Sequence, residues 1–61
     1  MREFERFYFS GWRVDCVRRN GFWALFVYDP AGHLRRTAIR EIPREKLRSF
    51  AQKEVSYARR N

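Results

Sequence analysis

Two turn signals that flank a short apolar stretch constrain the fold of this chain more than any other feature. The stretch is 22–28 (FWALFVY), and it lies between Asn20-Gly21 and the tetrapeptide 29–32 (DPAG). Asn-Gly favours a two-residue type I′ hairpin turn, because both central positions need positive φ. In the second turn, proline presets φ and Gly32 supplies the left-handed residue that closes a three-residue loop. A strand between two hairpin turns is the middle strand of a three-stranded antiparallel meander.

The neighbouring segments supply the other two strands and a helix. Alternating side chains predict a first strand over 12–19, and the basic segment 34–42 predicts a third. Pro43 then ends the extended segment and suits the first position of a helix. From Arg44 to about Arg59, apolar residues recur at helical spacing: Leu47, Phe50, Ala51, Val55 and Ala58.

With 61 residues the chain has the length of one small domain. Its aromatic content of 18% is typical of a folded protein rather than a disordered one. We expect an α+β domain over 1–61, with a three-stranded antiparallel meander at 12–42 and one C-terminal helix at 43–60 packed on one face. Residues 1–11 form an aromatic and basic N-terminal arm, which could be a further strand, a free arm or a lid over the sheet.

The two turns fix the register and so assign each side chain to a face. The first turn pairs Arg19 with Phe22, and the second pairs Tyr28 with Leu34. The face expected beneath the helix holds Trp12, Val14, Cys16, Trp23, Leu25, Val27, Thr37 and Ile39. The opposite face has no element to cover it and holds Arg13, Asp15, Val17, Arg19, Phe22, Ala24, Phe26, Tyr28, Leu34, Arg36, Ala38 and Arg40.

A net charge of +7, from fourteen basic and seven acidic residues, indicates a polyanion as partner, with nucleic acid favoured. Arginine binds phosphate or guanine, and aromatic rings stack on bases or contact thymine methyl groups. On the uncovered face we expect Arg13, Arg19, Arg36 and Arg40 to contact phosphate or guanine, and Phe26 and Tyr28 to contact sugars, methyl groups or bases. Arg59 and Arg60, at the end of the helix, are predicted to make secondary phosphate contacts.

The preferred target is duplex DNA, bound by a protein that is monomeric when free. Single-stranded nucleic acid or RNA is the nearest alternative, because exposed rings also suit unpaired bases. A second alternative is a protein-interaction module, such as a phage or mobile-element protein that docks on an acidic host protein. No apolar run approaches the ~20 residues of a membrane span, so no membrane partner is expected.

The segments 18–23 (RRNGFW) and 28–32 (YDPAG), followed by a basic strand and a C-terminal helix, resemble the arm-type DNA-binding domain of phage and transposon tyrosine recombinases. The layout is also similar to the plant ethylene-responsive factor domain, which shares that fold. The resemblance covers roughly 14–58 and implies a three-stranded sheet that enters the major groove. It places DNA contacts on Arg19, Phe26, Tyr28, Arg36 and Arg40. The recombinase catalytic domain is absent from this sequence.

The sequence favours neither catalysis nor metal binding. His33 is the only histidine and lies in a predicted turn, and Cys16 is expected in the core. One cysteine and one histidine cannot make a four-ligand zinc site. We therefore expect no enzyme activity, no catalytic residue, no metal and no cofactor. A lone cysteine is typical of a reducing compartment, and DNA binding there implies a cytoplasmic, nucleoid-associated protein.

Overall fold

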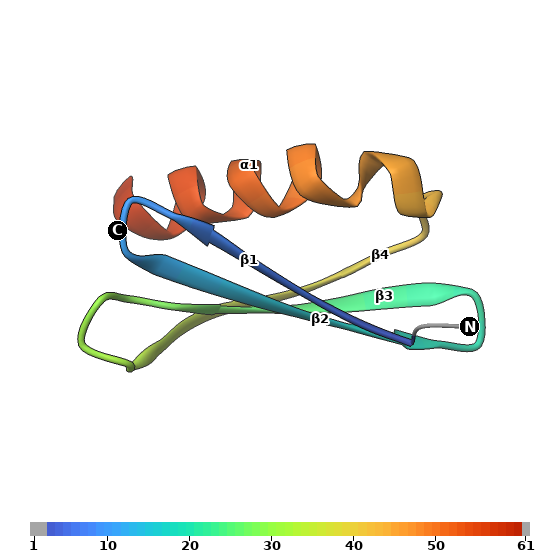
Figure 1. Cartoon of the computed structure of the whole chain (residues 1–61), viewed down its shortest axis with the longest axis horizontal. Coiled ribbons are helices and arrows are strands. Elements are labelled where there is room, and N and C mark those ends of the chain that lie inside the picture. Colours follow the sequence, from blue (N-terminus) through green and yellow to red (C-terminus); the bar gives the residue numbers. More distant parts are fainter. Residues whose placement is uncertain (1–2, 61) are drawn as a thin grey trace.

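The computed structural model describes residues 3–60, so residues 1–2 of the expected arm, and residue 61, lie outside the described part. The chain is an α+β protein in which an antiparallel sheet of four strands, in the order β1-β2-β3-β4, precedes one helix (Figure 1). The elements are β1 (Phe4–Phe9), β2 (Trp12–Arg19), β3 (Phe22–Tyr28), β4 (Leu34–Arg40), the short 3₁₀ helix η1 (Arg44–Lys46) and α1 (Leu47–Arg60). No helix within 3–60 has the length and apolar character needed to cross a membrane.

The prediction of three strands is wrong, because most of the arm forms β1. This strand pairs with β2 along its whole length, from Phe4 opposite Val17 to Phe9 opposite Trp12. The turn between them, Ser10-Gly11, has φ values of 52° and 86°, close to the 50° and 80° of Asn20-Gly21. Serine adopts positive φ less readily than asparagine, so this turn carried a weaker signal in the sequence. The arm therefore widens the sheet and does not cover it.

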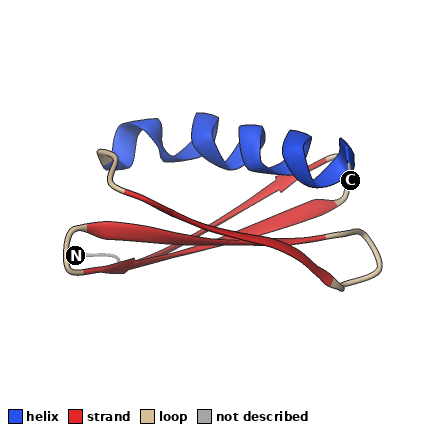
Figure 2. Cartoon of the chain, turned by 180° about the vertical axis from the view of Figure 1, so that it is seen from behind, coloured by secondary structure: helices blue, strands red, loops and turns tan. Residues whose placement is uncertain are grey.

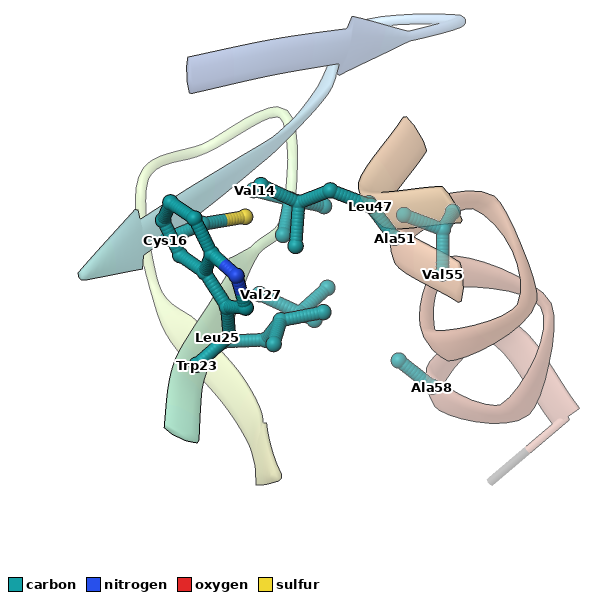
Figure 3. Close-up of a cluster of buried hydrophobic side chains, with 9 residues drawn as sticks. All are labelled: Val14, Cys16, Trp23, Leu25, Val27, Leu47, Ala51, Val55 and Ala58. Atoms are coloured by element: carbon teal, nitrogen blue, oxygen red, sulfur yellow. The ribbon is translucent and has the colours of Figure 1, made fainter. Parts of the chain in front are cut away.

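Helix α1 covers one face of the sheet, as predicted (Figure 2). The core between them is built from Val14, Cys16, Trp23, Leu25 and Val27 on the strands and Leu47, Ala51, Val55 and Ala58 on the helix (Figure 3). No other element among residues 3–60 lies on the far side of the sheet. We call that uncovered side the open face.

The register is as predicted between β2 and β3, but it changes between β3 and β4. Tyr28 faces Leu34 as expected, whereas Val27 faces Arg36, so a β-bulge shifts the rest of β4 by one residue. A shift of one residue moves each side chain to the other face. Arg36, Ala38 and Arg40 therefore lie on the helix side. Thr37 and Ile39, both predicted in the core, lie on the open face, and Ile39 is 66% exposed.

Glu54 gives a physical reason for this shift. It belongs to α1, and its side chain is buried against the sheet, with 1% of the residue exposed. Arg36 Nε donates to its Oε1 at 2.5 Å, and Arg40 Nη2 donates to its Oε2 at 2.8 Å. In the predicted register these arginines would lie on the opposite face and leave a buried carboxylate unpaired, at a cost of several kcal/mol. Exposing Ile39 costs less, about 1.5–3 kcal/mol, so ion pairing favours the bulged register.

Candidate nucleic-acid interface

The open face is a mixed aromatic and arginine surface that extends over all four strands. Its side chains form cross-strand rows, which are Phe4–Val17–Ala24–Ile39, Arg6–Asp15–Phe26–Thr37, Tyr8–Arg13–Tyr28–Leu34, and the pair Arg19–Phe22 next to the Asn20-Gly21 turn. Tyr8 is 63% exposed and Phe22 is 43% exposed, whereas Phe26 and Tyr28 are half-buried between their neighbours. Large apolar side chains exposed together on a small protein usually mark a binding surface.

Asp15 holds two of the arginines of the open face close to the sheet. Arg6 donates from Nε to Oδ1 at 2.8 Å and from Nη2 to Oδ2 at 3.3 Å, so it binds the carboxylate with two nitrogens. Arg13 Nε lies 3.4 Å from Asp15 Oδ1, and its guanidinium carbon lies 4.2 Å from the centre of the Tyr28 ring. A cation over an aromatic ring is attracted by the electrons of the ring face. The middle of the open face therefore presents a guanidinium over an aromatic ring and little free positive charge.

Arg19 differs from these two arginines. It is exposed at the end of β2, beside Phe22, and forms no ion pair with any carboxylate among the described residues. A guanidinium without a carboxylate partner keeps all of its donors available for an anion. Arg19 is thus the arginine of the open face best placed to contact phosphate.

The structure brings together four of the six predicted interface residues and separates the other two. Arg13, Arg19, Phe26 and Tyr28 share the open face, as the sequence predicted. The prediction that Arg36 and Arg40 share it is wrong, since the bulge in β4 places both on the helix side.

On that side, Arg36 and Arg40 are partly buried and bound to Glu54. Their side chains are 33% and 36% exposed. The guanidinium of Arg36 also lies 5.1 Å from the centre of the Tyr57 ring. These contacts explain both arginines as groups that hold α1 on the sheet. A charge within the apolar stripe of the helix, at Glu54, was the sequence signal that could have located them.

Much of the free positive charge lies on the helical segment rather than on the open face. Arg59 and Arg60 are exposed at the end of α1, as expected, and Arg60 lies 5.7 Å from the Tyr57 ring centre. The basic residues that form no ion pair within residues 3–60 are Arg18, Arg19, Lys46, Arg48, Lys53, Arg59 and Arg60. A polyanion therefore meets a positive surface on the helix side as well as at Arg19.

Cys16 and His33 lie where the sequence analysis expected them. Cys16 is fully buried, and burial raises the pKa of its thiol to about 12, so the thiol stays protonated and poorly reactive. His33 is exposed, with Nδ1 3.7 Å from Oδ2 of Asp29. Residues 3–60 enclose no pocket and contain no group of three or more His, Cys, Asp or Glu side chains that could hold a metal ion.

Asp29 organises the loop between β3 and β4. Its Oδ1 accepts the backbone N–H of Ala31 at 3.0 Å and that of His33 at 2.9 Å, and Arg35 Nη1 lies 3.3 Å from Oδ2. The hydrogen bond from the His33 backbone, with help from Arg35, lowers the pKa of Asp29. A carboxyl group with a lowered pKa stabilises the fold above its unfolded pKa, and this contribution is lost as the pH falls through the folded pKa.

We expect Asp29→Asn to remove this dependence on pH. The amide oxygen still accepts backbone hydrogen bonds, but the negative charge is lost. The wild-type protein should melt at a higher temperature than the variant at pH 7, and the difference should shrink below about pH 4. Thermal unfolding followed by circular dichroism between pH 7 and pH 2 measures this, with Glu41→Gln as an exposed control. A difference that stays constant over this range would contradict the prediction.

Comparisons with protein-family models, curated proteins and solved structures found no match to this chain. The resemblance to the arm-type domain therefore stays a prediction that rests on its two turn segments. The assignment of a function depends on the open face and on the distribution of charge around it.

Proposed function

We propose that this protein binds nucleic acid, with DNA favoured, through the open face. The observation that carries the proposal is the combination of exposed rings and arginines on a sheet face that no described element covers. In this arrangement Arg19 contacts phosphate, while Phe26 and Tyr28 contact bases or sugars. The guanidinium of Arg13, which lies over the Tyr28 ring, extends the planar surface.

The net charge of +7 supports the proposal through long-range electrostatic attraction. A strongly basic surface attracts polyanions before any contact forms, and binding weakens as salt rises, because each phosphate contact releases counterions. Arg59 and Arg60 remain proposed secondary phosphate contacts. Arg36 and Arg40 are left out of the interface, since both bind Glu54 on the helix side.

Several narrower expectations follow from this proposal and remain predictions. They are a binding module without enzyme activity, the arm-type relationship, a monomer when free, a phage or mobile-element origin, and a cytoplasmic, nucleoid-associated location.

A protein partner is the second candidate, and one observation favours it. The row Phe4–Val17–Ala24–Ile39 crosses the whole sheet without a charged side chain. Uncharged patches with aromatic side chains are typical of the centres of protein interfaces. An acidic protein would satisfy both this row and the surrounding positive charge.

Titration of a fluorescently labelled DNA at several salt concentrations tests the proposed function. We expect Arg19→Ala to weaken binding about 5- to 10-fold and to reduce the salt slope by about one unit. Lys53→Ala is the matched control, because it removes the same charge from the helix, and it should change affinity less than about 2-fold. Equal losses in the two variants would mean that charge alone, not the open face, binds the DNA. Absence of binding at low salt would overturn the proposal and favour the protein partner.

A further inference from the structure

We infer that the open face binds the unpaired bases of single-stranded nucleic acid and does not enter a groove of duplex DNA. This inference rests on the proposed function and names the strand state that the face recognises. Three features carry it: the width of the sheet, the contacts of its arginines, and the spacing of its aromatic rings.

The width of the sheet argues against groove binding. Neighbouring strands lie about 4.8 Å apart, so the outer backbones of four strands are about 14 Å apart, against about 10 Å for three. The major groove is about 12 Å wide and admits a helix or a two-stranded ribbon. Because β1 adds a fourth strand, the open face is too wide to lie flat in that groove. The outer backbones of the three-stranded sheet predicted from the sequence, about 10 Å apart, would lie within the width of the groove.

The arginines of the open face are poorly placed to recognise base pairs. Recognition of guanine in the major groove needs a guanidinium with two free donors directed at the base edge. Arg6 already uses two nitrogens on Asp15, and the guanidinium carbon of Arg13 lies 4.2 Å from the centre of the Tyr28 ring. The planar guanidinium of an arginine instead offers a surface on which an unpaired base can stack. Arg19 remains for one phosphate contact.

The aromatic rings lie too far apart for stacked bases and suit separated ones. Tyr8 lies in the row next to the Ser10-Gly11 turn and Phe22 lies next to the Asn20-Gly21 turn, so the two most exposed rings mark opposite ends of the open face. Phe26 and Tyr28, two residues apart on β3, are separated by about 7 Å along the strand. Successive bases in one strand of B-DNA are about 3.4 Å apart. Only a strand with unstacked bases can place a base on each ring.

The test compares a labelled oligothymidine with a labelled duplex of the same length, titrated with the full chain at two salt concentrations. We expect the single strand to bind at least about 10-fold more tightly than the duplex near physiological salt. Tyr8→Ala and Phe22→Ala should each weaken single-strand binding by about 5- to 150-fold, the range for the loss of one base–aromatic stack.

Tyr57→Ala is the matched control. Tyr57 is 41% exposed, close to the 43% of Phe22, but it belongs to α1 on the opposite side of the sheet. Single-strand affinity should change less than about 2-fold in this variant, and far-UV circular dichroism shows that each variant is folded.

Each contrary outcome has a distinct meaning. Tighter binding to duplex, with no effect of Tyr8→Ala or Phe22→Ala, would overturn this inference and leave the proposed function standing. Single-strand binding that is weakened by Tyr57→Ala as much as by Phe22→Ala would overturn the assignment to the open face. Failure to bind either DNA at low salt would overturn both proposals.

Discussion

Glu54→Ala will lower the free energy of unfolding by about 2–4 kcal/mol. Removal of one partner from a buried ion pair leaves the other charge uncompensated and costs about 3–5 kcal/mol. The lower range applies here because the side chains of Arg36 and Arg40 are about one-third exposed, at 33% and 36%, and water screens them in part. For a domain of this length, with a total stability of about 3–9 kcal/mol, such a loss is a large fraction of the whole.

Urea denaturation followed by far-UV circular dichroism measures this effect. Glu45→Ala is the control, since it removes an exposed carboxylate near the start of the helical segment and should change stability by less than about 0.5 kcal/mol. Glu54→Gln keeps the size of the side chain and one oxygen acceptor, so we expect a smaller loss, about 1–2 kcal/mol. A cost below about 1 kcal/mol for Glu54→Ala would mean that ion pairing does not select the register of β4.

The sequence predicted the centre of the sheet well because its local signals are strong there. Asn20-Gly21 and Gly32 adopt positive φ, as the two turns require, and β3 has the predicted bounds. Alternation then placed Trp23, Leu25 and Val27 in the core. These features depend on neighbours in the sequence, so a single sequence contains enough information to predict them.

The errors occurred where distant residues decide the structure. The register of β4 depends on Glu54, which is fourteen residues beyond Arg40 and contacts it only after the helix has packed. A register predicted from the turn residues alone could not take this contact into account. The prediction of the sheet face for Arg36 and Arg40 was therefore wrong. The predicted interface contained two arginines that instead hold α1 on the sheet.

The strand β1 was only one of three alternatives for the N-terminal arm, and it was left out of the predicted sheet for a different reason. Its apolar and charged residues alternate imperfectly in the sequence FERFYF, and its turn uses Ser10 where asparagine would have been a clear signal. The consequence reaches the proposed function, because the added strand widens the open face beyond the groove of a duplex. An error of one strand in the fold thus changes the expected ligand from base pairs to unpaired bases.

Trp23→Ala will destabilise the protein by about 3–5 kcal/mol, the range for truncation of a large buried aromatic side chain. Trp23 is fully buried between the sheet and the helix. Arg18 and Arg44 lie over its ring, with guanidinium carbons 5.7 Å and 5.2 Å from the ring centre. Truncation therefore removes core volume together with the surface on which both arginines lie, and we expect a substantial unfolded population at 25 °C.

Trp23→Phe separates the roles of the ring and of its N–H group. The buried Nε1 of Trp23 has no hydrogen-bond acceptor among the described residues, and a buried donor without a partner costs about 1–3 kcal/mol. Phenylalanine leaves a small cavity but also removes this penalty, so we expect a net loss below about 1.5 kcal/mol. Urea denaturation followed by circular dichroism compares both variants without depending on tryptophan fluorescence. An equal loss of stability in Trp23→Phe and Trp23→Ala would contradict this prediction. It would mean that the indole N–H finds a hydrogen-bond acceptor in solution and so stabilises the folded protein.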